Sequence, residues 1–134
     1  MKIVEVKRNH NEFLKLYFDL LGEETLFNFF NHRCWVVRDK GKAVAFCSSV
    51  VRKERYVYFS SCGVTEDYRG KGLQRRMIRH RLKKAKEDGA EVAYTYTSKD
   101  NEPSFLNLQR EGFELYVPED EYAGRDFLYW RKYL

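Results

Sequence analysis

Two closely spaced glycines, at the point where a strand pattern gives way to a helix pattern, are the feature of this sequence best suited to chemistry. They lie in the segment VTEDYRGKGLQRRMIRHRLKKAK, residues 64–86. A helix start carries about half a positive charge from its unpaired backbone N–H groups, and so favours acidic side chains. Here it has Arg69, Lys71 and Arg75 instead. A bound anion would explain these cations, because glycine lets a ligand approach the backbone closely. The segment therefore predicts a phosphate site, with a size and charge that suit a pyrophosphate.

Two common phosphate-binding patterns do not fit this loop. The P-loop pattern G-x-x-x-x-G-K-S/T is absent from the chain. A dinucleotide-binding fingerprint would need a third glycine at position 75, which is Arg75, and an earlier place in the chain.

The positive charge of the protein is concentrated in the same segment. Residues 69–86 contain nine cations and no acid, so a net charge of +5 leaves −4 on the rest of the chain. Apolar residues recur at helical spacing in this segment and predict a stripe that packs on a sheet, with the arginines and lysines on the other faces. The stripe consists of Leu73, Met77, Ile78, Leu82 and Ala85. Lys83, Lys84 and Lys86 are typical of a solvated helix end.

The elements that must position this loop follow from periodicity along the chain. Strands are expected at residues 2–6, 34–39, 42–53, 54–64, 90–97, 113–117 and 125–134. Helices are expected at residues 11–21 and 23–30, from residue 73 to just before Gly89, and at residues 101–112. The order β-α-α-β-β-β-α-β-α-β-β predicts one mixed α/β (α+β) domain over residues 1–134, with a largely antiparallel first half.

The glycine segment also resembles a known family. VTEDYRGKGLQRRMI is similar to the acyl-CoA-binding motif Q/R-x-x-G-x-G/A of the GNAT superfamily of N-acetyltransferases. In that family, the backbone amides of this loop hold the pyrophosphate of coenzyme A. The resemblance places Arg69 first and Gly72 at the middle glycine, and assigns backbone contacts to Gly70, Lys71, Leu73, Gln74 and Arg75. Gln74 replaces the usual glycine or alanine, so we expect its side chain to point away from the phosphate.

A second motif extends the resemblance. NEPSFLNLQREGF, residues 101–113, is similar to the later helix of the family, N-x-x-A/S followed by a Gly-Phe pair. This implies that Asn101 and Ser104 lie near the pantetheine and adenosine arm of the cofactor. The matching element order spans essentially the whole chain. It implies acetyl-CoA as cofactor, and a mainly antiparallel sheet that is splayed in the middle and carries helices on both faces.

The resemblance also suggests where acyl transfer takes place. In this fold, strands 54–64 and 90–97 are parallel and diverge, and backbone groups of Cys62 and Val64 face the pantetheine and the acetyl carbonyl. When an amine attacks a thioester in a ternary complex, a backbone N–H near Val64 would stabilise the charge on the carbonyl oxygen.

The sequence offers several candidates for the acid of the reaction. The tyrosine that many family members use to protonate the leaving thiolate is replaced by Leu108. The alternatives are another hydroxyl, a water molecule, or a poor catalyst that binds acyl-CoA with little or no transfer. The hydroxyl candidates are Tyr96, Tyr116 and Tyr122.

No carboxylate within residues 56–64 offers a base. Glu54 and Glu66 near its ends are more typical of exposed surface acids, and water held by Ser60 or Ser61 is a further hypothesis.

The acceptor is indicated only by charge. In the family, the acceptor site is formed by the first two helices and the loop between the last two strands, and the matching residues 21–30 and 117–124 are acidic and aromatic. This favours a cationic primary amine, on a small molecule or on a protein, although acids that merely solubilise the loops are an equal alternative. A nucleic-acid-binding module built on the basic helix is a third interpretation, which the absence of an evident aromatic platform disfavours. A monomer and a homodimer remain open.

The remaining composition favours a cytoplasmic protein without metal or membrane partners. No apolar run approaches the ~20 residues needed to cross a bilayer, and residues 1–13 lack the apolar block of a signal peptide. Three cysteines without a C-x-x-C pair indicate buried free thiols in a reducing compartment, and the three histidines lack metal-ligand spacing.

Overall fold

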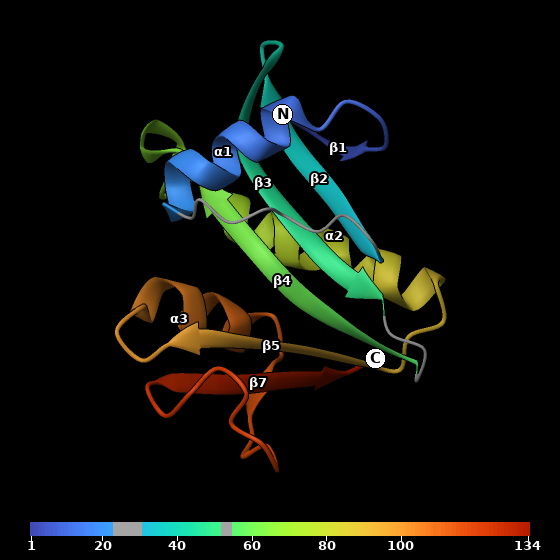
Figure 1. Cartoon of the computed structure of the whole chain (residues 1–134), viewed down its shortest axis with the longest axis vertical. Coiled ribbons are helices and arrows are strands. Elements are labelled where there is room, and N and C mark those ends of the chain that lie inside the picture. The colour runs from blue at the N-terminus through green and yellow to red at the C-terminus, as the bar shows by residue number, and fades with distance from the viewer. Residues whose placement is uncertain (23–30, 52–54) are drawn as a thin grey trace.

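The computed structural model describes residues 1–22, 31–51 and 55–134, and within them one seven-stranded sheet (Figure 1). The strands are β1 (Lys2–Val6), β2 (His32–Asp39), β3 (Lys42–Val51), β4 (Tyr56–Val64), β5 (Val92–Ser98), β6 (Glu114–Leu115) and β7 (Phe127–Tyr133). The helices are α1 (Asn11–Leu21), α2 (Leu73–Glu87) and α3 (Glu102–Arg110), with a short 3-10 turn, η1 (Glu66–Tyr68), between β4 and α2. The helix expected at residues 23–30 lies outside the described residues.

The sheet order is β1-β2-β3-β4-β5-β7-β6, and β4–β5 is the one parallel pair among the described strands. A parallel neighbour needs a crossover connection, which α2 provides between β4 and β5. The prediction of a mixed, mainly antiparallel sheet is therefore confirmed.

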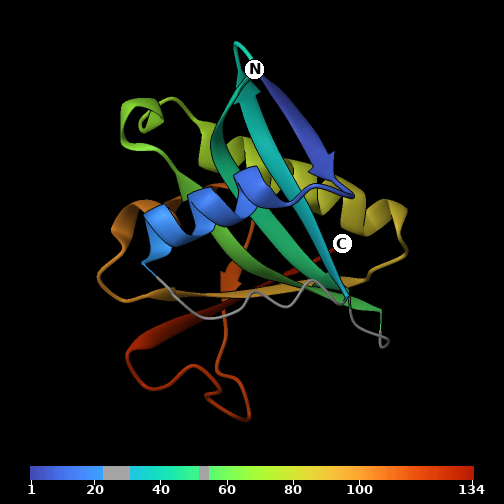
Figure 2. The ribbon, with the colours of Figure 1, turned by 45° about the horizontal axis from the view of Figure 1, so that its top comes forward.

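The helices cover both faces of the sheet, as expected. Figures 1 and 2 show α1 in front of the sheet and α2 behind it. Successive strand residues point to opposite faces, so neighbouring residues in β2 pack on different helices. Val36 belongs to the cluster around Phe13 of α1, whereas Trp35 packs with Met77 of α2.

The splay in the middle of the sheet is set by a short parallel ladder. Tyr56–Tyr58 pair with Val92–Tyr94, and beyond this point β4 and β5 separate. The register between β3 and β4 shifts between Cys47 and Ser49, so β4 has one extra residue there. Such a bulge bends a strand and increases its twist. The bend in β4 lies where the two strands separate.

Two sequence-based expectations need correction. The strand expected over residues 113–117 is confined to β6, because the backbone N–H of Phe113 donates to Leu108 O at the end of α3. The arginines of α2 do not all lie on its outer faces, since Arg81 is only 4% exposed and lies within the buried stripe.

The three cysteines are free thiols. Cys34 and Cys47 are buried, and Cys62 is half-buried. In the described parts of the chain, His, Cys, Asp and Glu form no cluster suited to a metal ion. Among those same residues, the helices are too short and too polar to span a bilayer.

Candidate functional site

A cleft of about 830 Å³ runs between the end of β4, the start of α2 and α3. It brings together segments that are far apart in the chain: the end of α1, the end of β4, the glycine loop and α3. Ten of the eleven residues predicted to bind the cofactor line it: Cys62, Val64, Arg69, Gly70, Gly72, Leu73, Gln74, Arg75, Asn101 and Ser104. Lys71 does not line it; its ammonium lies 4.9 Å from the centre of the Tyr68 ring.

The glycine loop forms a backbone cradle at the start of α2. Gly70 and Gly72 have φ angles of 74° and 80°, which glycine adopts at no steric cost. Gly72 is the N-cap residue, and no side chain caps the helix. The first backbone N–H groups of α2 are thus available to an anion. A Cβ at either glycine would meet no atom within 4 Å, so the backbone there is open to a ligand. These features fit a pyrophosphate.

The cationic side chains around the cradle are partly engaged with the protein. Arg69 Nε donates to the carbonyl oxygen of Val64 at 3.1 Å, which fixes the loop to the end of β4. Arg75 and Arg79 both bind the Glu111 carboxylate, whose side chain is 10% exposed. Hydrogen bonds from Arg79, and then from Arg75, lower the pKa of Glu111 despite its burial. Glu111 therefore ties α2 to the end of α3.

The Gln74 side chain reaches from α2 to α3. Its Nε2 donates to Ser104 Oγ at 3.0 Å, and its Oε1 accepts from Asn107 Nδ2 at 2.7 Å. Asn101 caps α3 by accepting from the Ser104 backbone N–H at 3.4 Å. Ser104 thus helps to hold α3 against α2, Asn101 fixes the start of α3, and both line the cleft.

Two backbone N–H groups of β4 face the gap between the strands. Thr65 donates its N–H to Val44 O at 2.9 Å, which makes this a hydrogen-bonded pair of the antiparallel ladder. Hydrogen-bonded and non-hydrogen-bonded pairs alternate along such a ladder. Val64 and Cys62, at alternate positions in register with Ala45 and Cys47, therefore direct their N–H groups away from β3 and toward the β5 side, where pairing has ended.

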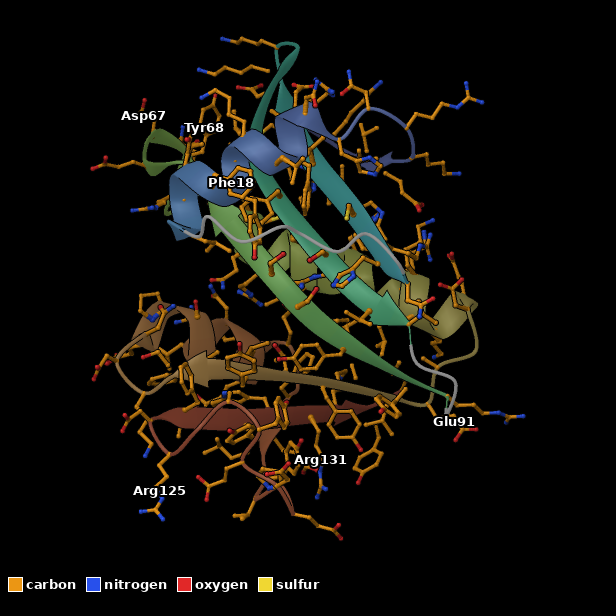
Figure 3. All side chains as sticks on the ribbon, in the orientation of Figure 1. Phe18, Asp67, Tyr68, Glu91, Arg125 and Arg131 are labelled. Carbon is orange, nitrogen blue, oxygen red and sulfur yellow. The ribbon has the colours of Figure 1, made fainter. Side chains whose placement is uncertain are left out.

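The structure separates the two tyrosines predicted as catalytic residues. Tyr96 is 38% exposed and lines a second cavity of about 250 Å³ that joins the cofactor cleft. Tyr116 lines neither cavity; its ring lies 5.6 Å from Tyr94 and under the guanidinium of Arg131. Figure 3 shows Arg131 on β7. Burial raises the pKa of Tyr116. Leu108, at the usual tyrosine position, is a core residue on the wall of the second cavity.

A group of three tyrosine rings lies on the α1 side of this cavity. Tyr58, Tyr96 and Tyr122 come from β4, β5 and the loop before β7, and their ring centres are 6.0–6.1 Å apart. Burial raises the pKa of Tyr58, and it raises that of Tyr122 to about 12. The acidic loop 117–124 supplies Tyr122 together with three exposed carboxylates, Glu119, Asp120 and Glu121.

The residues considered as a base, or as holding a water molecule, lie at several different positions. Glu66 is exposed in η1, and Glu54 lies outside the described residues, as does most of the expected acceptor segment 21–30. Ser60 and Ser61 line the second cavity and contact Ser48 Oγ, at 2.7 Å from Ser60 Oγ.

Sequence reasoning missed several residues that shape the site. Tyr68 OH donates to Asp39 Oδ2 at 2.6 Å and so links the glycine loop to the β2–β3 hairpin; Figure 3 shows Tyr68 on this loop, beside the end of α1. Asn107 and Arg110 line the cleft from α3. Asn107 follows Ser104 by three residues, and this helical spacing could have identified it. Nothing in the sequence pairs Tyr68 with Asp39.

Comparisons with known proteins agree with this geometry. Residues 5–113 match the Acetyltransferase (GNAT) family. No curated protein sequence matches the chain significantly. Among solved structures, an acetyltransferase from Bacillus subtilis in complex with CoA is 16% identical, with 99% of this chain and 98% of that one covered and a TM-score of 0.84. A GNAT family acetyltransferase from Elizabethkingia anophelis with acetyl-CoA bound is 11% identical, with 99% and 97% covered and a TM-score of 0.85. A ribosomal-protein-alanine N-acetyltransferase from Brucella melitensis is 20% identical, with both chains fully covered and a TM-score of 0.78.

The family match covers far more than half of the chain, and it includes the loop and helix that form the cradle. It confirms the sequence-based prediction of a GNAT fold with acetyl-CoA as the cofactor of the family. The chain belongs to the GNAT family of acetyltransferases.

Proposed function

We propose that this protein is an acetyl-CoA-dependent N-acetyltransferase that acetylates a cationic primary amine by direct attack in a ternary complex. The observation that carries the proposal is the cradle of Gly70 and Gly72 beside the open edge of β4. One end of the cleft offers uncapped helix N–H groups to a pyrophosphate, and the other offers the N–H groups of Cys62 and Val64 to a carbonyl oxygen.

The cofactor, when bound, supplies a thioester whose carbonyl carbon accepts the amine. In our proposal the chain contributes backbone groups first: Val64 N–H stabilises negative charge on the carbonyl oxygen. Arg69 holds the Val64 carbonyl, and this keeps the end of β4 in place. We assign Tyr96, which lies on the wall of the second cavity, as the proton donor to the leaving thiolate.

The cationic acceptor is supported by the aromatic and acidic surface beside the cavity. The faces of tyrosine rings attract an ammonium group, and three such rings meet at Tyr58, Tyr96 and Tyr122. The carboxylates at residues 119–121 add a negative potential on the same loop as Tyr122. Both a small polyamine-like molecule and a protein amine satisfy this chemistry.

A catalytically weak acyl-CoA-binding protein is the second candidate, and Leu108 is the observation that favours it. This residue is 5% exposed and apolar where many relatives carry the tyrosine acid.

The decisive experiment measures transfer of radiolabelled acetyl groups from acetyl-CoA to a panel of primary amines, together with equilibrium binding of acetyl-CoA. The test variant is Gly72→Val, and the matched control is Gly41→Val. Both glycines have φ of 80°, and a Cβ added at either would meet no atom within 4 Å, but Gly41 lies in the β2–β3 turn, away from the cleft. We expect transfer to at least one cationic amine, binding reduced at least tenfold in Gly72→Val, and near-normal binding in Gly41→Val. Binding without transfer to any amine would favour the second candidate, and equal binding by the two variants would contradict the cradle.

A further inference from the structure

The second cavity carries a chemical feature that acetyl transfer does not require. It opens from the cofactor cleft between β4 and β5, and five residues line both spaces: Leu21, Cys62, Gln74, Asn101 and Ser104. Hydroxyl groups from β4 and β5 form much of the remaining wall, and Arg81 is the one charged residue of the lining among the described residues. No Asp or Glu of the described chain lines it. The cavity is therefore polar and carries a positive charge.

Arg81 is held rigidly at the wall of this cavity. Its side chain comes from the buried face of α2 and is 4% exposed. Nη1 donates to Ser48 O at 3.1 Å, Nε donates to Met77 O at 3.4 Å, and the guanidinium lies 4.4 Å from the centre of the Phe59 ring. A guanidinium has five N–H donors. Two of them bind backbone carbonyls, and the other three have no acceptor among the described residues.

A buried guanidinium without a carboxylate is unusual, because burial of a charge is costly unless an opposite charge compensates it. In the described parts of the chain, Arg81 takes part in no ion pair. The planar fork of donors matches the two oxygens of a carboxylate. The residue therefore indicates an anionic ligand group inside the cavity.

Two ligand groups of the proposed reaction do not fit this position. The pyrophosphate cradle lies at Leu73, and Arg81 follows eight residues later, about 12 Å further along α2 at ~1.5 Å per residue. A cationic acceptor would be repelled by the guanidinium. The acyl chain of the thioester is the remaining part of the ligand that could reach Arg81, because Cys62 borders both the cofactor cleft and the second cavity.

We propose that the second cavity binds the terminal carboxylate of a short acyl chain, so that the protein uses CoA thioesters of dicarboxylic acids in preference to uncharged acyl groups of the same length. This inference rests on the proposed acyltransferase function and names the acyl donor for that site. The reaction is balanced as for acetyl transfer: the amine nitrogen forms a bond to the carbonyl carbon, the carbon–sulfur bond breaks, and the amine proton leaves with the CoA thiol. The terminal carboxylate is unchanged, and Arg81 binds it throughout.

The test compares succinyl-CoA with butyryl-CoA, two four-carbon acyl groups that differ in the terminal charge. We expect the wild type to show kcat/KM for succinyl-CoA about 10- to 100-fold above that for butyryl-CoA, as befits one charge-assisted contact. Arg81→Met keeps an apolar stem of similar length and should reduce this ratio to about one, while acetyl-CoA use changes less than about threefold. Lys83→Met, an exposed cation on the same helix, should keep the wild-type ratio.

Equal use of the two thioesters by the wild type would overturn the proposal, as would an unchanged ratio in Arg81→Met. Should Arg81→Met fail to fold, Arg81→Lys keeps the charge without the fork, and its ratio should fall several-fold; a full wild-type ratio would contradict the proposed carboxylate contact. An acetyl-CoA assay with amines that do and do not bear a carboxylate identifies the source of the anion. If Arg81→Met raises KM only for the carboxylate-bearing amine, the carboxylate belongs to the acceptor and our assignment is wrong.

Calorimetry of the two thioesters without an amine separates this proposal from the proposed function. Tighter binding of succinyl-CoA than of butyryl-CoA, lost in Arg81→Met, supports the carboxylate pocket even if no amine is acylated. Acetyl transfer with equal affinity for the two thioesters supports the function and refutes the pocket.

Discussion

Replacing Gly63 by alanine should destabilise the fold at the point where α1 approaches the cofactor cleft. A Cβ at this position would lie 2.6 Å from Cε1 of Phe46 and 3.1 Å from Cδ1 of Leu20. The Phe46 ring is fully buried and packs edge-on against Phe13 at 5.2 Å between ring centres. It cannot give way without moving α1. Overpacking of this kind costs roughly 1–3 kcal/mol, which corresponds to a decrease in Tm of very roughly 3–15 °C.

The same displacement should weaken acetyl-CoA binding, because Gly63 and Leu20 both line the cleft. Thermal and urea denaturation measure the first effect, and calorimetric titration measures the second. A double-mutant cycle with Phe46→Leu isolates the clash, since the smaller side chain makes room for the new methyl group. We expect Gly63→Ala to cost at least ~1 kcal/mol less in the Phe46→Leu background than in the wild type. A Gly63→Ala variant as stable as the wild type, or one whose cost is the same in both backgrounds, would refute this reasoning.

Three further predictions concern titration and catalysis. Burial, aided by the charges of Lys84 and Lys83, lowers the pKa of His80 below its ordinary 6.5. The unfolded chain therefore binds a proton more readily, and the free energy of unfolding should fall as pH drops below about 6.5. Urea denaturation at pH 7 and pH 5 should show a smaller loss of stability for His80→Leu than for the wild type. Hydrogen bonds from Arg79 and Arg75 lower the pKa of Glu111 below 4.5, so its contribution to the free energy of unfolding is present above pH 4.5 and lost in more acidic solution. Glu111→Gln should lower stability by about 1 kcal/mol at pH 7 and show a flatter acid-denaturation curve. An unchanged curve would contradict the role of this ion pair. Tyr96→Phe should lower kcat of acetyl transfer about tenfold or more, whereas Tyr116→Phe should leave kcat within about twofold, and the reverse order would reassign the acid.

The glycine cradle was predictable because it is made of backbone. Two glycines at a strand-to-helix junction specify a left-handed turn and an uncapped helix start, and these are properties of a short sequence. The same holds for Asn101, which caps its own helix three residues before Ser104. The residues that form these features are close together in the chain, so their types and spacing are sufficient to predict them.

The surroundings of the second cavity could not be predicted in the same way, because they depend on side chains that meet only in three dimensions. Tyr96 and Tyr116 are both tyrosines near strand ends, and only the sheet order brings one to the cavity and the other beside Arg131. The charge of Arg81 predicts a position on the outer face of α2, but the residue is buried. Its spacing from Met77 and Ala85 is four residues in each direction, which is the spacing of the buried stripe.

The bulge in β4 explains why the faces of this strand could not be assigned by simple alternation. Before the bulge, the odd-numbered Val57 and Phe59 belong to the core on the α3 side of α2. If alternation continued unbroken, the side chain at position 63 would lie on that face as well. The extra residue between Phe59 and Cys62 reverses the alternation, so Cys62 packs with the α2 cluster and position 63 faces Phe46 on the α1 side, where only glycine fits. The one inserted residue therefore accounts both for the glycine at position 63 and for the outward N–H groups of Cys62 and Val64, which line the cleft.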